Sequence, residues 1–232
     1  MPKLTAMPVL AFAASAALIA AATLSVSAEQ AVTAPAPKIA APANAGASET
    51  IVLAGGCFWG VQAVFQHVQG VERAVAGYAG GRTGRPTYEQ VSTGATGYAE
   101  VVAVTFDPKT IPLGEILRIY VSVAHDPTEL NRQGPDEGSQ YRSEIFAADA
   151  TEAKYARAYI AELDAAKVYP RPIVTKVETG AAFFPAEGYH QNYATLHPEQ
   201  PYIAYYDLPK IENLKRLFPA RYREKPALVA AL

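Results

Sequence analysis

Strand-like and helix-like segments alternate through most of this chain, and this alternation constrains the fold more than any other feature. In some segments the apolar residues recur every three or four positions, which predicts helices; others are short β-branched or continuous apolar runs, which predict strands. The predicted strands cover residues 51–54, 71–78, 100–106, 142–147 and 173–178, and the predicted helices cover 57–68, 112–124, 149–168, 187–195 and 209–217. We therefore expect an α+β protein, a single domain built as a two-layer α/β sandwich.

The two ends of the chain differ in composition from this domain. Residues 1–28 carry one charge, Lys3, before a long apolar run that ends in Val26-Ser27-Ala28, and this pattern predicts a cleaved secretory signal peptide. An uncleaved membrane anchor is the alternative, because the apolar run is about long enough to span a bilayer. Residues 29–48 are rich in Ala and Pro and predict an extended linker. The folded unit is then expected over 49–220, followed by a loose tail at 221–232.

The overall composition excludes several classes of protein. Half of the 232 residues are hydrophobic and 18% are charged, which is unlike a disordered or collagen-like chain. The formal charge of −2 gives no electrostatic basis for binding nucleic acid. The single cysteine, Cys57, excludes an intramolecular disulfide and a cysteine-rich zinc site. His190 and His197 lack close partners in sequence, so we expect no metal site.

Cys57 follows a predicted strand and the turn Gly55-Gly56, and it stands at the start of a predicted helix. Unpaired N–H groups and a partial positive charge at a helix N-terminus favour thiolate over thiol. Phe58 and Trp59 come next, and one of these rings can enter the core while the other forms the wall of an apolar pocket beside the sulfur. This context predicts a reactive thiol, whereas a buried, inert cysteine is the alternative.

Four polar residues could assist such a thiol. Glu100 begins a strand and shares a face with its apolar residues, where an apolar environment would let it hold a proton near neutral pH. A strand-end glutamate that faces water is the alternative. Asp136 and Tyr141 lie in the polar loop 126–141, and Tyr88 lies in an earlier loop, the kind of segment that carries functional sites. Because the chain has 14 tyrosines, packing or surface positions are the alternative for both tyrosines.

Two other functions fit parts of this pattern. A cysteine hydrolase would pair Cys57 with His125 or His190 as a base, and loss of that imidazole would abolish turnover. No short cysteine-hydrolase signature surrounds Cys57, however. A redox-inert binding module would instead hold an apolar peptide side chain in the aromatic pocket, and its thiol would react no faster than free cysteine.

The segment Gly56-Cys-Phe-Trp-Gly60 resembles the A-type peptide methionine sulfoxide reductases. Four further segments occur in the order typical of that family, and together they extend over most of residues 51–210. They are Gly97-Tyr-Ala-Glu-Val-Val102, His125-Asp-Pro-Thr128, Arg132-Gln-Gly-Pro-Asp-Glu-Gly-Ser-Gln-Tyr-Arg-Ser143 and Pro185-Ala-Glu-Gly-Tyr-His-Gln191. The resemblance implies an oxidoreductase that reduces methionine S-sulfoxide, free or in proteins, with a ferredoxin-like sandwich fold and no cofactor.

The resemblance also implies a role for each candidate residue. Cys57 matches the nucleophile that attacks the sulfoxide sulfur and becomes a sulfenic acid. Glu100 matches the residue that gives the sulfoxide oxygen its proton. The remaining roles are hydrogen bonding around that oxygen, for Tyr88, Tyr141 and Asp136, and binding of the S-methyl group, for Phe58 and Trp59.

Two departures from the family pattern affect the expected partners. Many members carry further cysteines near the C-terminus, whereas this tail has none, so recycling implies an external, thioredoxin-like thiol reductant. Gly188 stands where the family often has an acid. The leader predicts export to a bacterial periplasm and repair of oxidised exported proteins, or membrane tethering if the leader is retained. We expect a monomer that binds no nucleic acid and has no stable membrane association after cleavage.

Overall fold

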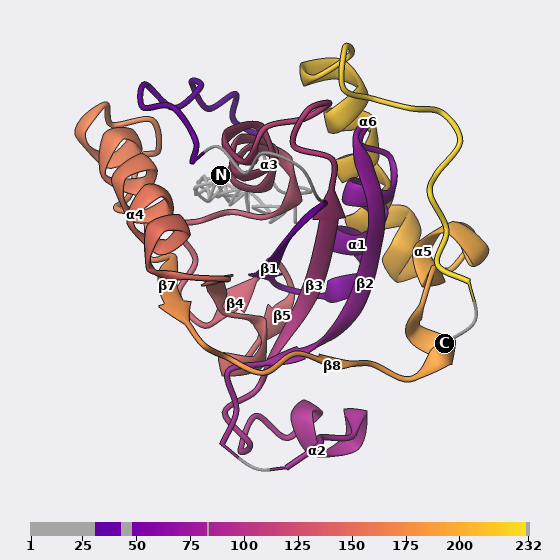
Figure 1. The fold of residues 1–232 in the computed structure, drawn as a ribbon. Helices are drawn as coiled ribbons and strands as arrows, with labels where there is room; N and C mark the ends of the chain where they lie inside the picture. The colour runs from indigo at the N-terminus through magenta and orange to yellow at the C-terminus, as the bar shows by residue number, and fades with distance from the viewer. Residues whose placement is uncertain (1–30, 43–47, 83, 231–232) are drawn as a thin grey trace, which may run out of the picture.

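A mixed sheet of six strands, in the order β7-β6-β1-β3-β2-β8, lies at the centre of the protein (Figure 1). The computed structural model describes residues 31–42, 48–82 and 84–230, so the signal peptide predicted at 1–28 lies outside the described residues. The sheet strands are β1 (Glu49–Gly55), β2 (Val71–Ala79), β3 (Ala99–Phe106), β6 (Ser143–Ala147), β7 (Lys176–Thr179) and β8 (Phe184–Pro185). Strands β4 (Arg132–Gln133) and β5 (Asp136–Glu137) form a separate hairpin.

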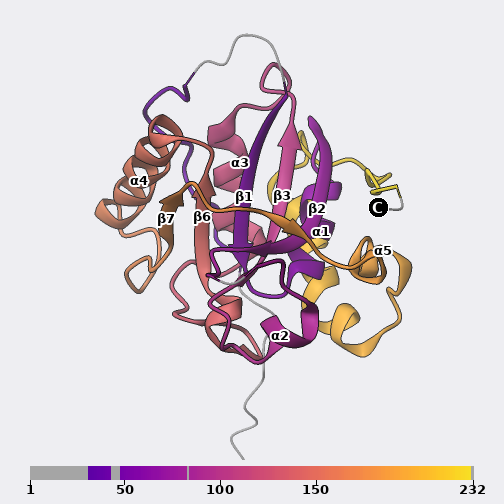
Figure 2. The same cartoon turned by 60° about the horizontal axis from the view of Figure 1, so that its bottom comes forward.

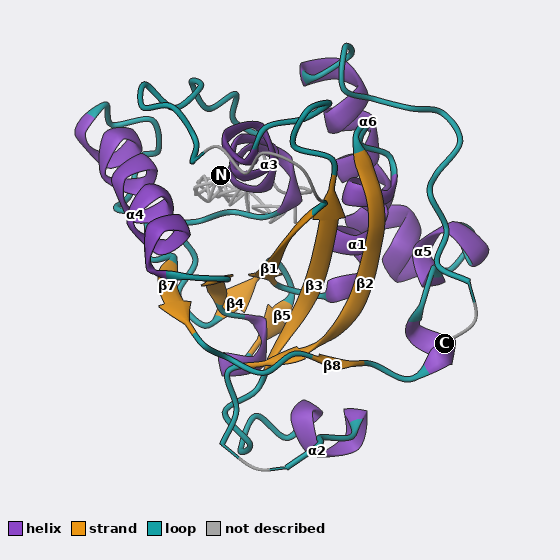
Figure 3. Cartoon of the chain, in the orientation of Figure 1, coloured by secondary structure: helices purple, strands orange, loops and turns teal. Residues whose placement is uncertain are grey.

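Helices alternate with strands along much of the chain, and Figure 3 distinguishes the two by colour. They are α1 (Phe58–Gln66), α2 (Tyr88–Ser92), α3 (Leu113–Ile119), α4 (Ala150–Ala165), α5 (Tyr193–Leu196) and α6 (Leu208–Leu217). Two π-helical turns, Tyr120–Ala124 and Ile203–Asp207, extend α3 and precede α6. The 3-10 turns are Ser139–Tyr141 and Gly188–His190.

The strand register brings the end of β1 to the beginning of β3. Neighbouring strands are antiparallel except for the parallel pair β6 and β7. Leu53 pairs with Val102 on β3, and Glu100 pairs with Tyr78 on β2. The turn after β1 therefore lies at the same end of the sheet as Glu100.

The two faces of the sheet are covered differently. Side chains of α1, α3 and α4 pack on one face and form the main core with alternate strand residues, including Leu53 and Val102. On the other face, a smaller cluster around Val101 and Phe146 is covered by Phe183, from the segment that crosses the sheet after β7 (Figure 2). The prediction of a mixed α/β domain is confirmed. No helix among the described residues is both long and apolar enough to cross a membrane.

Part of the Ala/Pro-rich segment is attached to the domain. The backbone of Val32 donates to Ser122 O (3.1 Å), and Ala34 N–H donates to the Ser122 hydroxyl (3.1 Å). Arg118 and Tyr159 donate to the carbonyl oxygens of Ala34 and Pro35 (both 2.7 Å). Residues 31–37, which we call the strap, thus contact α3 and α4, whereas the sequence predicts a linker outside the folded unit. The partners come from distant helices, so local composition does not reveal them.

The C-terminal segment also differs from the expected loose tail at 221–232. Arg223 N–H donates to His67 O (2.8 Å) and Ala227 N–H donates to Gln66 O (2.9 Å). Asn192 and Val229 exchange two hydrogen bonds of 2.9 Å. The carbonyl groups at the end of α1 lack partners within the helix, and the passing chain supplies donors to two of them.

Some predicted elements have other boundaries, and tertiary contacts explain the change at Asn192. The helix predicted over 187–195 is interrupted at Asn192, which adopts a left-handed conformation with φ 61°. Its side chain bonds Gln66 and Val229, which fixes this residue between two separate segments. The strand predicted at 173–178 begins at Lys176, and α2 forms in the region predicted as a loop.

Candidate active site

Cys57 is the N-cap residue of α1, directly after the glycine turn that ends β1. Gly56 has φ +84°, a conformation that suits glycine, and a Cβ there would lie 2.5 Å from the Cβ of Gln133. The turn is therefore possible only without a side chain at residue 56. Cys57 is half-buried as a residue and makes no side-chain cap hydrogen bond.

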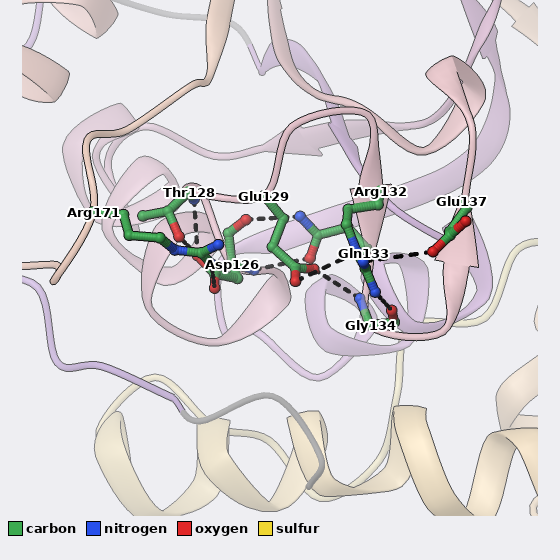
Figure 4. A network of polar contacts seen from close by, with 8 residues as sticks. All are labelled: Asp126, Thr128, Glu129, Arg132, Gln133, Gly134, Glu137 and Arg171. Atoms are coloured by element: carbon green, nitrogen blue, oxygen red, sulfur yellow. Dashed lines mark hydrogen bonds and ion pairs between the residues drawn. The ribbon is translucent and has the colours of Figure 1, made fainter. Parts of the chain in front are cut away.

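The loop that carries Asp136 packs against this turn. Gln133 is buried, and its amide accepts from Asp126 N–H (3.0 Å) and donates to Asp126 O (2.7 Å). Figure 4 shows this pair together with Arg132, which lies 3.7 Å from Glu129 and 3.5 Å from Glu137. Hydrogen bonds and ion pairs thus connect residues within the predicted loop 126–141, and the loop packs against Gly56 through Gln133.

Glu100 lies beside Cys57. Its side chain is 3% exposed, and its Oε2 accepts a hydrogen bond of 3.1 Å from the backbone N–H of Phe58. The alternative of a glutamate facing water is therefore wrong. Burial raises the pKa of Glu100 to about 8 against the opposing effect of the Phe58 N–H bond, which favours the carboxylate, and the carboxyls of Asp136 and Asp207 add to the rise. Glu100 consequently holds a proton at pH 7.

The pKa of the Cys57 thiol is raised well above its ordinary value, contrary to the expectation from its place at a helix start. Burial is the largest cause, and the carboxyls of Glu100, Asp207 and Asp136 add to it, whereas the backbone N–H of Trp59 acts in the opposite direction. Desolvation thus outweighs the helix N-terminus, and Glu100 adds to the shift only when it is ionised. The resting site holds a neutral thiol beside a neutral carboxylic acid.

Tyr88, Tyr141 and Asp136 are brought into the electrostatic environment of this pair. Burial raises the pKa of both tyrosines, and Glu100 is the next cause for each, with contributions from Cys57 and Asp136. Both hydroxyls therefore remain protonated donors. Burial also raises the pKa of Asp136, although its short hydrogen bond from the Tyr202 hydroxyl opposes that shift. Cys57, Glu100, Tyr88, Tyr141 and Asp136 thus lie close enough to influence one another's pKa.

The two aromatic residues after Cys57 take different positions. The Phe58 ring is 1% exposed and packs 5.9 Å from the Tyr78 ring, within the core. Trp59 is partly buried, and Tyr193 stacks on it with ring centroids 4.0 Å apart. Phe58 therefore packs within the core, whereas the indole can form a wall at the site.

Several residues of this site were missed by sequence reasoning. Tyr202 bonds Asp136 and meets the edge of the Trp59 ring at 6.2 Å, while Tyr193 covers a face of that ring. Asp207 is fully buried where a side chain on Gly60 would lie. With 14 tyrosines in the chain, nothing local distinguishes the two that matter here.

The histidines do not form a Cys–His pair with Cys57. His125 is buried, bonds Ser143 Oγ (2.7 Å) and Tyr120 O (3.1 Å), and burial lowers its pKa to about 3. His190 Nδ1 accepts from the Trp59 indole. The charged groups that raise the pKa of Cys57 are carboxyls. Within the described residues, no group of three or more His, Cys, Asp or Glu side chains could hold a metal ion.

Comparison with known proteins agrees with this site. Residues 49–222 match the family model of peptide methionine sulfoxide reductases. Peptide methionine sulfoxide reductase MsrA 2 of Mesorhizobium japonicum is 60% identical over 182 residues, covering 78% of this chain and 93% of that protein. MsrA of Thermus thermophilus is 45% identical over 175 residues, covering 75% and 98%.

Solved structures give the same result. Methionine sulfoxide reductase A of Corynebacterium diphtheriae is 32% identical, with a TM-score of 0.57 and coverage of 75% of this chain and 90% of that chain. Mxr1 of Saccharomyces cerevisiae in reduced form is also 32% identical, with a TM-score of 0.61 and coverage of 69% and 91%. The chain belongs to the peptide methionine sulfoxide reductase family. It resembles the MsrA members of that family and, like them, is an oxidoreductase.

Proposed function

We propose that this enzyme reduces methionine S-sulfoxide, free or within proteins, to methionine. The observation that carries the proposal is the hydrogen bond of 3.1 Å from Phe58 N–H to the buried Glu100 carboxyl, next to Cys57. Because burial raises the pKa of Glu100 to about 8, a transferable proton is available at pH 7 beside the only cysteine of the sequence. A sulfoxide needs both a nucleophile at its sulfur and a proton on its oxygen.

In the proposed step, Cys57 loses its proton and attacks the sulfoxide sulfur while Glu100 gives its proton to the oxygen. The oxygen atom then passes to the Cys57 sulfur, and two electrons pass from that sulfur to the substrate. The products are methionine and a cysteine sulfenic acid, which keeps the proton that Glu100 gave. The proton that Cys57 lost restores Glu100. Protonation of Glu100 also removes its negative charge, which otherwise raises the pKa of Cys57.

Tyr88 and Tyr141 supply neutral O–H donors for the developing charge on the sulfoxide oxygen. Their support is the raised pKa of both hydroxyls, with Glu100 and Cys57 among the causes. Asp136 assists through the Tyr202 hydroxyl, which donates to it. The phenols stay protonated throughout, so they stabilise charge without competing with Glu100 for the proton.

The Trp59 ring provides an apolar wall for the S-methyl group, and Phe58, packed in the core with its ring centroid 6.5 Å from that of Trp59, supports this wall. The sulfur of a sulfoxide is pyramidal, so oxygen, methyl group and nucleophile each need a separate place. With hydrogen-bond donors on one side of the pocket and the Trp59 wall on another, one epimer places its oxygen at the donors and its methyl group at the wall. The other epimer would place its methyl group at the donors and its oxygen against the indole. This arrangement supports selectivity for one epimer, and the resemblance to the MsrA enzymes implies that it is the S epimer.

We further propose that an external thiol restores the enzyme. A first thiol displaces water from the sulfenic acid and forms a mixed disulfide with Cys57, and a second thiol releases Cys57 and leaves as a disulfide. The support is the absence of a second cysteine from the 232 residues. A thioredoxin-like protein, which carries two such thiols, fits this requirement.

We make two further proposals, one on the type of fold and one on the location of the protein in the cell. We infer that β1, α1, β2, β3, α3 and β6 form a ferredoxin-like unit, which the antiparallel order β6-β1-β3-β2 supports. We infer export to the periplasm for repair of oxidised proteins, supported by the apolar leader and the Val26-Ser27-Ala28 pattern. Cell fractionation with N-terminal sequencing tests cleavage after Ala28, and an intact leader in the membrane fraction would contradict it.

The reaction is tested with a peptide that contains one methionine sulfoxide of defined configuration, with dithiothreitol as reductant. We expect methionine to form from the S epimer only, and Cys57→Ser to abolish its formation. Glu212→Gln, an exposed change on α6, is the control. Full activity of Cys57→Ser, or equal rates on both epimers, would contradict the proposal.

A further inference from the structure

The Trp59 ring is held on three sides by residues that follow β8 in the chain. Tyr193 stacks on one face with an interplanar angle of 16°, and Tyr202 meets the ring at 82°. The indole Nε1–H donates a hydrogen bond of 3.2 Å to Nδ1 of His190. Ring stacking still lets the indole slide or turn in its plane, whereas the hydrogen bond fixes one direction. His190 therefore determines which edge of Trp59 faces the pocket.

The chemistry of this bond defines the state of His190. An indole N–H can only donate, so Nδ1 must carry a lone pair and the proton of the neutral ring lies on Nε2. His190 is 2% exposed, and burial lowers its pKa, although Glu187 and Glu89 act in the opposite direction. The imidazole is thus neutral at pH 7 and can accept.

The surroundings of His190 support a role in positioning rather than in proton transfer. Its ring lies 4.9 Å from the Phe58 ring and 4.4 Å from the Tyr88 ring, measured between centroids. Within the described residues, its Nε2 is buried and has no hydrogen-bond partner. The one polar contact that the ring makes to the protein is therefore the bond from Trp59.

We propose that His190 is a positioning residue, which uses its Nδ1 lone pair to hold the Trp59 indole as the wall of the S-methyl pocket. This inference rests on the proposed function, because it takes Trp59 as that wall. The methyl group occupies the pocket both before and during the reaction, so a misplaced wall weakens binding of substrate and transition state alike. Loss of the bond should raise KM and leave kcat nearly unchanged.

Two substitutions at one position separate the lone pair from the rest of the imidazole. His190→Ala removes the acceptor, whereas His190→Asn keeps an oxygen on Cγ, where Nδ1 is attached, with an amide nitrogen in place of Cδ2 and without the unpartnered Nε2 end of the ring. We expect KM for a methionine sulfoxide peptide to rise about fivefold in His190→Ala and to return to within about twofold of wild type in His190→Asn.

Trp59 is the only tryptophan of the chain, so its fluorescence reports on this ring alone. We expect His190→Ala to shift the emission maximum to longer wavelength and to increase acrylamide quenching, and His190→Asn to restore both. His67→Asn is the matched control: His67 is also a buried histidine, but it bonds Arg223 O (2.9 Å) at the other end of α1. That variant should change neither KM nor emission.

The inference is overturned if folded His190→Ala keeps wild-type emission and KM, or if His190→Asn behaves as the alanine variant does. A parallel loss of kcat and melting temperature would show a merely structural role and would also overturn it. If His190→Ala does not fold, a cycle with Trp59→Phe and His190→Leu decides, because leucine fills the site without an acceptor: His190→Leu should raise KM in the presence of the indole and leave it unchanged in Trp59→Phe, and an equal rise in both backgrounds would overturn the inference. Failure of the wild-type enzyme to reduce the peptide would instead contradict the proposed function.

Discussion

Glu100→Gln removes the proposed proton while keeping the size of the side chain and an oxygen that can accept from Phe58 N–H. We expect kcat to fall by about 10²–10⁴-fold, the usual contribution of a general acid. In the wild-type enzyme the reaction requires protonated Glu100, whose pKa is about 8. Activity due to this group should therefore be level below that pH and should fall above it.

The same substitution has a predictable effect on stability. The Glu100 pKa is about 8 in the folded protein against an ordinary value of 4.5, so between these pH values the unfolded chain binds fewer protons than the native one. Stability then decreases as pH rises through this window, by about 1.4 kcal/mol per pH unit. At pH 7 the ionisable carboxyl costs about 3 kcal/mol, which a neutral glutamine avoids.

The assay combines peptide kinetics from pH 6 to 9.5 with urea unfolding at pH 4 and pH 7. We expect the activity of Glu100→Gln to show no fall near pH 8. The variant should be more stable than wild type at pH 7, and its gain in stability over wild type should be much smaller at pH 4. Glu212→Gln, exposed on α6, should change neither property. Near-normal kcat in Glu100→Gln, or equal stability changes at the two pH values, would refute the reasoning.

Three further predictions concern the surroundings of the site. Tyr202→Phe removes the hydroxyl that donates to Asp136, and we expect kcat/KM to fall about fivefold; an unchanged value would exclude this contact from function. Deletion of residues 1–47 removes the strap, and urea unfolding should show a loss of about 2–4 kcal/mol with unchanged KM, whereas equal stability would contradict the strap contacts. Asp207→Asn removes a carboxyl that raises the Cys57 pKa, so iodoacetamide should alkylate Cys57 faster at pH 7, and a slower reaction would contradict this.

Local signals in the sequence predicted the parts of the site that local structure makes. The strand, the Gly55-Gly56 turn and the helix start place Cys57 as expected, since these depend on neighbours in the chain. The apolar face of strand 100–106 allowed either a buried Glu100 or a glutamate facing water, and the structure shows that it is buried. The first inference depends on short-range periodicity, which the sequence displays directly.

Properties that depend on distant segments could not be predicted. The raised pKa of Cys57 results from burial and from carboxyls on β3, on β5 and at Asp207, before α6, none of which is local to the thiol. The contacts of Tyr193 and Tyr202 with Trp59 likewise depend on how the C-terminal segments pack against α1. The strap resembles a linker in composition and docks only because α3 and α4 present partners.

The pKa of the thiol changes which measurement distinguishes a reductase from a binding module. Slow alkylation of Cys57 by iodoacetamide is expected for either, because the resting thiol is protonated near neutral pH. In the complex with substrate, Cys57 attacks the sulfoxide sulfur while Glu100 gives its proton to the oxygen and then takes up the proton that Cys57 loses. Only the product of a turnover therefore separates the two functions.

The central claim is that Cys57 takes the sulfoxide oxygen while Glu100 protonates it. It is tested most directly by the mass of the Cys57 peptide after one turnover without reductant. We predict a gain of one oxygen atom on Cys57, one methionine formed per enzyme, and neither product in Cys57→Ser. Methionine formed with Cys57 unmodified, or no methionine at all, would contradict the account.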